Sequence, residues 1–268
     1  MTYETFVALG DSFTEGLDDP APAGHGYVGW ADRVAGALAS VTPGLRYANL
    51  AVRGRLLGPI VADQVPAAIH LRPRLVSLAG GTNDILRPRC DPPALAALLD
   101  DAVRRLRDTG AEVLVFTATD PTRRLPSARR LLPRIQVLND AVRRVAGDHG
   151  ALLVDLWQER VFDDPRLWSD DRLHLGPEGH RRVAAAVLER LGVAGVPAAD
   201  GDWRALPPAA GPPQWLRARL ADAGWARRHL APWVYRRLTG RSSGDELAAK
   251  QAELAPLLAP GPHQVPDR

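Results

Sequence analysis

Over most of its length the chain alternates short apolar runs with longer segments of helical periodicity, and this alternation constrains the fold more than any other feature. The short runs predict strands at residues 5–9, 45–50, 75–79, 113–117 and 152–155. Apolar residues three or four positions apart predict helices at 29–39, 92–107, 127–147 and 177–191. Strands that alternate with helices indicate a mostly parallel β-sheet covered on both faces, with functional groups gathered beyond the carboxyl ends of its strands.

The sequence changes character after residue 191. Residues 192–213 are rich in glycine, alanine and proline, which is typical of a linker, and residues 260–268 have the composition of a disordered tail. Between them, residues 215–238 are helix-like and rich in tryptophan and arginine. We expect a main domain at residues 1–195 and a C-terminal extension at 196–268, made of the linker, the helical stretch and the tail.

Three roles are open for the helical stretch. It can pack its tryptophans on the main domain, close over a site as an apolar lid, or lie on an anionic membrane surface. Packing is the favoured interpretation, because large aromatic side chains are usually buried. Membrane contact is the least favoured of the three.

Composition argues against several kinds of partner and cofactor. The net charge is +3, but the basic residues are interleaved with 31 acids and no recognition motif accompanies them, so no nucleic-acid partner is expected. Cys90 is the only cysteine, which excludes a zinc–thiolate cluster, and the seven histidines lack metal-ligand spacing. The Gly-x-Gly-x-x-Gly pattern at 24–29 follows a proline-rich loop instead of a strand, so it does not predict a dinucleotide site. We expect no metal and no cofactor.

The start of the chain has no basic segment followed by an apolar run, and no segment approaches the roughly 20 apolar residues of a membrane span. Together with the single cysteine, these features favour a cytoplasmic location. The sequence leaves the oligomeric state open.

Ser12 is the candidate nucleophile. It lies in a Gly-Asp-Ser-Phe segment directly after the expected strand at 5–9. The glycine two residues before it lets the chain turn sharply and expose the hydroxyl, and the amides of the turn can then meet an anion. The alternative is that Ser12 only caps the next helix, since serine is common at that position.

An Asp-x-x-His pair, Asp171 and His174, supplies a base and a residue that orients it. His174 would take the proton of Ser12 and return it to the leaving alcohol, while Asp171 bonds Nδ1 and stabilises the imidazolium. Asp170 offers a competing carboxylate, and a solvated surface turn is the alternative for the pair. His180 falls inside the following helix and is interpreted as structural.

Gly54 and Asn83 are the candidate oxyanion donors, together with the backbone amide of Ser12. Each comes shortly after an expected strand. A glycine amide allows close approach of the substrate oxygen, and the asparagine adds a side-chain donor. The alternatives are an ordinary turn at Gly54 and an Asx-turn at Asn83. Asp11 and Asp84 are expected to buttress the loops.

A rival serine, Ser242, lies in a Gly-x-Ser-x-Gly pentapeptide at 240–244. A nucleophile elbow of that kind needs a strand before it and a helix after it, followed in sequence by an acid and a histidine. Here a helix-like stretch precedes the pentapeptide and His263 is the only histidine that follows. We therefore interpret it as a flexible turn.

In order and wording, the segments around these residues resemble the SGNH (GDSL-type) hydrolase family over about residues 3–191. The four blocks are Gly-Asp-Ser, the glycine at 54, Gly-x-Asn-Asp and Asp-x-x-His. The resemblance implies a three-layer α/β/α sandwich with a flavodoxin-like, five-stranded sheet, and metal-free hydrolysis of carboxylic esters or thioesters by a catalytic domain at 1–195. Phe13 replaces the leucine of the family's name motif, and the second block has a single obvious glycine.

We therefore predict a serine esterase or lipase that cleaves a small-molecule acyl ester through an acyl-enzyme. Its catalytic residues would be Ser12, Asp171 and His174, and its oxyanion hole would be formed by Ser12, Gly54 and Asn83. One alternative is an acyltransferase that passes the acyl group to an alcohol, and a further one is a catalytically silent binding module. The loop at 17–29 is the expected rim of the substrate pocket, whose shape sets the acyl chain length.

Overall fold

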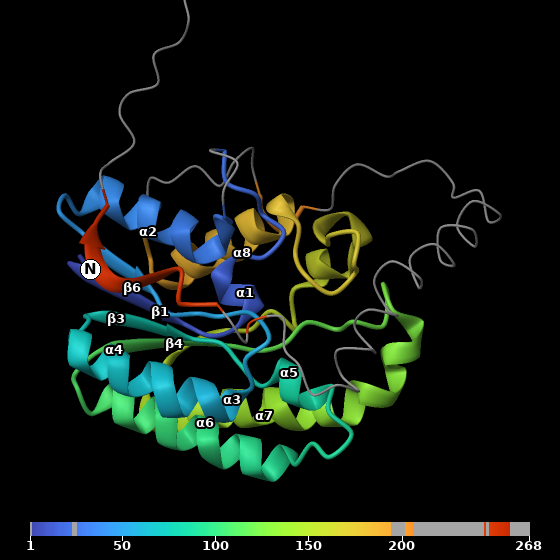
Figure 1. The fold of residues 1–268 in the computed structure, drawn as a ribbon. Coiled ribbons are helices and arrows are strands. Elements are labelled where there is room, and N and C mark those ends of the chain that lie inside the picture. The colour runs from blue at the N-terminus through green and yellow to red at the C-terminus, as the bar shows by residue number, and fades with distance from the viewer. Residues whose placement is uncertain (1, 23–25, 194–201, 206–243, 245–246, 258–268) are drawn as a thin grey trace, which may run out of the picture.

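The computed structural model describes residues 2–22, 26–193, 202–205, 244 and 247–257 of the 268-residue chain. These residues form a central β-sheet between two layers of helices (Figure 1). The expected three-layer α/β/α architecture with a mostly parallel sheet is confirmed.

The sheet has six strands in the order β5-β4-β3-β1-β2-β6. The strands are β1 (Thr5–Leu9), β2 (Arg46–Asn49), β3 (Leu75–Leu78), β4 (Glu112–Phe116), β5 (Leu152–Val154) and β6 (Gln251–Pro256). Strands β1 to β5 pair in parallel, and their order is the flavodoxin-like order 2-1-3-4-5. All five expected strands are present.

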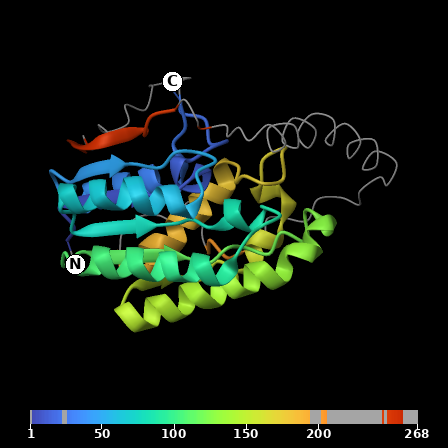
Figure 2. The same ribbon diagram turned by 60° about the horizontal axis from the view of Figure 1, so that its bottom comes forward.

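The prediction of a five-stranded sheet is wrong by one strand, because the described residues include a sixth strand, β6. β6 pairs antiparallel with β2, with Ala255 opposite Tyr47, and in Figure 2 it is the red strand at the edge of the sheet. It comes from the C-terminal extension, where no strand is expected. Its sequence has no β-branched or aromatic residue, and all its side chains are at least partly exposed, so neither propensity nor alternation marks it as a strand.

The helices divide between the two faces of the sheet (Figure 1). One face carries α2 (Gly29–Val41) and α8 (Pro177–Arg190), and the other carries α4 (Val65–Leu71), α6 (Pro92–Arg107) and α7 (Leu132–His149). In β1, Phe6 and Ala8 belong to the core beneath the first pair, whereas Val7 and Leu9 belong to the core beneath the second group. Because alternate side chains of a strand point to opposite faces, the continuous apolar run of β1 serves both cores.

The helix expected at 127–147 is divided in two. Residues 126–131 form the 3₁₀-helix η2 (Pro126–Leu131), and α7 begins at Leu132. Pro133 explains the boundary, because proline fits the first turn of an α-helix but would break a helix that had already begun.

The connection from β2 to β3 contains helices that periodicity does not predict. The chain passes through α3 (Leu57–Pro59), the π-helix η1 (Ile60–Gln64) and α4. A glycine and two prolines within this stretch interrupt the apolar pattern on which a helix prediction rests. Short helical turns follow three other strands: α1 (Ser12–Glu15), α5 (Thr82–Ile85), η3 (Arg160–Asp163) and η4 (Pro165–Leu167).

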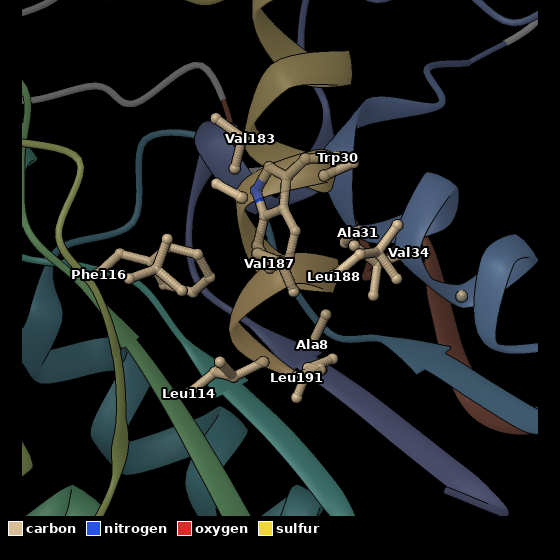
Figure 3. Close-up of a cluster of buried hydrophobic side chains, with 14 of the residues drawn as sticks. Ala8, Trp30, Ala31, Val34, Leu114, Phe116, Val183, Val187, Leu188 and Leu191 are labelled. Atoms are coloured by element: carbon tan, nitrogen blue, oxygen red, sulfur yellow. The ribbon is translucent and has the colours of Figure 1, made fainter. Parts of the chain in front are cut away.

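Trp30 is the centre of the core between the sheet and the helices α2 and α8. Figure 3 shows its indole among Val183 and Val187 of α8 and Phe116 of β4. Its ring centroid lies 4.9 Å from that of Phe116 and 5.6 Å from that of Phe13. Phe13 directly follows the candidate nucleophile, so this aromatic cluster anchors the turn that carries it.

Most of the C-terminal extension lies outside the described residues, including the helical stretch at 215–238, the serine at 242 and the tail at 260–268. None of the helices in the described residues combines the length and apolar character that a bilayer crossing requires.

Candidate active site

All five sequence-predicted site residues line one cavity of about 660 Å³. Ser12, Gly54 and Asn83 follow the carboxyl ends of β1, β2 and β3, which are neighbours in the sheet. Asp171 and His174 come from the turn that precedes α8. The topology therefore gathers residues that are up to 162 positions apart in sequence, because parallel strands end at the same edge.

The turn that carries Ser12 depends on Gly10. Its φ is +152°, and a Cβ at this position would lie 2.6 Å from both the carbonyl oxygen of Ala79 and Oγ1 of Thr14. Gln64 fixes both backbone polar groups of Gly10, because Gly10 N donates to Gln64 Oε1 (2.8 Å) and Gln64 Nε2 donates to Gly10 O (2.9 Å). The chain therefore turns immediately after β1 and leads Ser12 into the cavity.

Asp11, and not Ser12, caps helix α1. Asp11 Oδ1 accepts a hydrogen bond from Phe13 N at 3.0 Å, and Ser12 is the first residue of the helix. The Ser12 side chain makes no hydrogen bond within the described residues. Ser12 lines the cavity and is 8% exposed. The alternative interpretation, in which Ser12 only caps the helix, is wrong, because Asp11 is the capping residue.

Asp171 orients the imidazole of His174. His174 Nδ1 donates to Asp171 Oδ2 at 2.5 Å, which leaves Nε2 without a partner in the described part of the chain. The other carboxylate oxygen, Oδ1, accepts from Ser169 Oγ (2.7 Å), Leu173 N (2.9 Å) and His174 N (2.9 Å). Asp171 is thus fixed by its own turn and is the carboxylate that contacts His174, instead of its neighbour Asp170.

The pKa values of the pair follow from this contact. Burial alone would raise the pKa of Asp171, but hydrogen bonds from His174, the backbone and Ser169 lower it far below its ordinary value. Burial alone would lower the pKa of His174, but the hydrogen bond and charge of Asp171, with the charges of Asp18 and Asp11, raise it above the ordinary value of 6.5. Asp18 Oδ2 lies 3.9 Å from His174 Nδ1.

The ligand-type atoms of Asp18, Asp171 and His174 all lie within 4.8 Å of one another, an arrangement that could hold a metal ion. The Nδ1 atom of His174, however, donates to Asp171, and a nitrogen that carries this proton has no lone pair for a metal. We therefore interpret the cluster as an imidazole that is hydrogen-bonded to one carboxylate and lies near a second, and not as a metal site.

Two backbone amides in the cavity are available to an anion. The N–H groups of Ser12 and Gly54 have no hydrogen-bond partner among the described residues, and both residues line the cavity. Gly54 has a φ of +75°, which glycine adopts without strain.

Asn83 differs from these two amides because its donors are occupied. Asn83 Nδ2 donates to Asp11 Oδ2 and to the carbonyl oxygen of Arg55, both at 3.0 Å. Asp11 is 3% exposed, and burial raises its pKa to about 6. Asp84 accepts from Leu57 N at 3.0 Å, so both acids brace loops around the site.

His180 is held as a neutral structural histidine. Its Nδ1 accepts from Trp30 N (3.3 Å) and its Nε2 donates to Leu17 O (3.1 Å), so the two ring nitrogens link α8 to α2 and to the loop after α1. Burial lowers its pKa to about 4, which keeps the ring uncharged near neutrality.

Much of the cavity wall comes from a segment at the end of β4 and beyond it that the sequence does not mark as part of a site. Of the expected rim at 17–29, Leu17 lines the cavity, whereas most of the wall comes from residues 79–87 and 116–138. The wall is largely apolar, but it includes Arg87, Arg124 and Arg130. In a chain with 33 arginines no local pattern distinguishes these three, and their position depends on how the loops fold.

Comparison with known proteins places the chain among ester hydrolases. Residues 8–182 match the GDSL-like Lipase/Acylhydrolase family. No curated protein matches the chain.

Three solved structures share the fold. LAE5, an alpha/beta hydrolase enzyme from the metagenome of Lake Arreo, Spain, has a TM-score of 0.60 and 25% identity, over 72% of this chain and 97% of its own. TesA has a TM-score of 0.58 and 24% identity, over 70% and 97%. A catalytic mutant of Axe2, an acetylxylan esterase from Geobacillus stearothermophilus, has a TM-score of 0.61 and 20% identity, over 78% and 98%.

Proposed function

This chain belongs to the GDSL-like lipase/acylhydrolase family and is a carboxylic ester hydrolase, and we propose that it works through an acyl-enzyme on Ser12. The main support for this proposal is that the candidate nucleophile and the candidate base lie in the same cavity. Ser12, from the end of β1, and the hydrogen-bonded Asp171–His174 pair, from the turn before α8, line the same cavity. A weakly nucleophilic hydroxyl thereby shares a site with a base that is itself oriented by a carboxylate.

Acylation begins when Ser12 Oγ attacks the acyl carbon of the ester and its proton moves to His174 Nε2. Asp171 keeps the other ring proton on Nδ1 and stabilises the imidazolium that forms. The tetrahedral intermediate then collapses, and the leaving alcohol takes the proton from Nε2. The acyl group remains bound to Ser12 as an ester.

Deacylation repeats these steps with water as the nucleophile. His174 takes a proton from the water as its oxygen attacks the acyl-enzyme, and it returns that proton to Ser12 Oγ as the bond to the serine breaks. In both steps, negative charge develops on the former carbonyl oxygen. The unpartnered amides of Ser12 and Gly54 support a role as its donors, and Asn83 is the proposed third donor.

The proposal is tested with a fluorophosphonate probe and a nitrophenyl ester of short chain length. The wild-type protein should be labelled at Ser12 and should hydrolyse the ester, and Ser12→Ala should do neither. Ser242→Ala, at the serine of the Gly-x-Ser-x-Gly segment, is the matched control and should keep both properties. Labelling that survives Ser12→Ala and disappears in Ser242→Ala would overturn the proposal.

The same acyl-enzyme could pass its acyl group to an alcohol. Product analysis in water with added acceptor alcohols distinguishes the two outcomes: hydrolysis yields the free acid, whereas an acyltransferase yields the new ester even at low alcohol concentration.

A further inference from the structure

Two arginines of the cavity wall form no ion pair with the acidic residues of the described lining. Arg87 lies in the loop after α5, and Arg124 lies between β4 and η2. The acidic residues of the lining are Asp11 and Asp171, and both carboxylates accept hydrogen bonds from other protein groups. Within the described residues, neither arginine has a carboxylate at ion-pair distance, although the charges of Asp120, Asp163 and Asp171 act on Arg124 from farther away.

The guanidinium of Arg124 is fixed in place by stacking. Its Cζ atom lies 3.3 Å from the centroid of the Trp168 ring. Trp168 is itself anchored, because its Nε1 donates to the carbonyl oxygen of Phe162 at 2.9 Å. A guanidinium held over a fixed aromatic ring loses little conformational entropy when it binds a ligand.

The hydrogen bonds of Arg124 go to neutral acceptors. Nε donates to Arg172 O (2.9 Å), Nη1 donates to Asp120 O (2.9 Å) and Nη2 donates to Thr119 Oγ1 (3.4 Å). A guanidinium has five N–H donors, so two of them have no partner in the described part of the chain. Burial lowers the pKa of Arg124 to about 9 even though the charges of Asp120, Asp163 and Asp171 raise it. These acids therefore offset only part of the cost of burying the cation, and a further anion in direct contact would stabilise it.

The second of the two arginines, Arg87, has a buried donor without a partner in the described part of the chain. Its Nε atom is buried and has no hydrogen-bond partner among the described residues. Buried donors of this kind are rare, because the lost hydrogen bond to water is not replaced. The backbone of the loop after α5 is held in place, because Arg134 Nη1 donates to the carbonyl oxygen of Arg87 at 2.9 Å. An acceptor from outside the described residues would satisfy this donor.

We propose that Arg87 and Arg124 are specificity-determining residues that bind a carboxylate carried by the ester substrate, in its acyl or its alcohol part. A planar carboxylate offers two oxygens and matches the paired donors of a guanidinium. The apolar lining, which includes Leu125, Leu131 and Leu156, would contact the hydrocarbon between the carboxylate and the scissile bond. This inference rests on the proposed function for its identification of the cavity as the ester site.

The test measures binding in the Ser12→Ala background, where the esters are not consumed. The first pair is 4-nitrophenyl hydrogen adipate and its methyl ester, which differ in a carboxylate on the acyl side. The second pair is 4-acetoxybenzoate and its methyl ester, which differ on the alcohol side. In one pair the anionic member should bind about tenfold or more tightly than the neutral member, the range expected for a charge-assisted hydrogen bond.

Adding Arg124→Gln, or Arg87→Gln, should lower this anion-to-neutral ratio of affinities about tenfold. The ratio cancels any general loss caused by a disturbed loop. Arg129→Gln is the matched control, because Arg129 is exposed on η2 and does not line the cavity, and it should leave the ratio unchanged. The pair that shows the preference identifies the side of the ester that carries the carboxylate.

The inference is overturned if the anionic members bind no better than the neutral ones, if they do not bind at all, or if the preference survives both arginine substitutions. Failure of the proposed function gives a different result, namely a wild-type protein that the fluorophosphonate does not label at Ser12. A binding preference without labelling would leave the anion site in place and remove the hydrolytic mechanism.

Discussion

Asn83 donates a side-chain N–H to Asp11, the residue next to Ser12, at 3.0 Å. Its second N–H goes to the carbonyl oxygen of Arg55 at the same distance. Because a side-chain amide has two hydrogens, Asn83 has no spare donor in this arrangement. To bind an oxyanion it must exchange one of these acceptors, and the neutral carbonyl of Arg55 is the weaker competitor.

We expect Asn83→Ala to lower kcat by roughly 10²–10³-fold with little change in KM, as for the loss of other oxyanion donors. The reason is that the exchange becomes favourable only when full negative charge develops on the substrate oxygen. Steady-state kinetics on a nitrophenyl ester measure the effect, and a melting curve checks that Asp11 tolerates the loss of its partner. A change confined to KM would place Asn83 in ground-state binding.

Ser12→Ala and His174→Ala should each remove nearly all ester turnover while the protein keeps its circular dichroism spectrum. The double variant should be little worse than either single variant, because the two residues act as a unit. Additive losses in kcat would mean that Ser12 and His174 serve separate steps.

The activity should fall as the pH drops through the pKa of His174, because the neutral imidazole is the base. Hydrogen bonding to Asp171 and the charges of Asp18 and Asp11 raise this pKa, so the acid limb of kcat/KM should lie above the ordinary histidine value of 6.5. An acid limb well below pH 6.5 would contradict the assignment of His174 as the base.

Removing the charge of Asp18 should move that limb to lower pH, since Asp18 helps to hold the proton on His174 at 3.9 Å. Asp18→Asn suits the backbone, whose φ of +68° asparagine tolerates well. Asp148→Asn, at an exposed position on α7, is the control and should leave the limb unchanged. An equal shift in both variants would indicate a general effect of net charge.

Chelators should leave turnover unchanged. The carboxylate-rich surroundings of His174 could suggest a metal, but its Nδ1 proton is engaged with Asp171. Dialysis against EDTA followed by an ester assay is the measurement. Activity that disappears and then returns with zinc or manganese would contradict the proposed mechanism.

The sequence alone predicted that the candidate site residues lie together at one edge of the sheet. Ser12, Gly54 and Asn83 each follow a strand that its apolar run makes evident, and parallel strands bring such positions to one edge. The three-residue spacing of Asp171 and His174 permits the observed side-chain contact within a single turn. These relationships depend on short-range patterns and one topological rule.

Other features could not be predicted because they depend on contacts between distant loops. Gln64 bonds the backbone N–H and C=O of Gly10 from 54 positions away in sequence, and no local pattern marks it. Arg124 reaches the Asp171 turn only because the loop after β4 folds over Trp168. Strand β6 forms by pairing with the edge strand β2, and its own residues have low β-propensity. Its sequence therefore does not predict a strand.

The C-terminal extension should contribute to stability, because its described parts are tied to the main domain. Lys250 Nζ forms an ion pair with Asp32 at 2.6 Å and donates to the carbonyl oxygens of Val28 and Glu15. Trp203 is 9% exposed in the core beneath α8. Truncation after residue 200 removes both residues together with β6, and it uncovers the edge of β2 for pairing with other chains.

We expect this truncation to lower Tm by several degrees and to reduce solubility, measured by differential scanning fluorimetry and light scattering. For a domain of this size, about 1 kcal/mol corresponds to roughly 2–4 °C. Lys250→Met in the full chain isolates one contribution: it leaves the partly buried Asp32 carboxylate without its cation, which should cost about 1–3 kcal/mol. A truncated protein with unchanged Tm and solubility would show that the extension adds nothing to the fold, because neither the strand pairing nor the burial of Trp203 would then be needed.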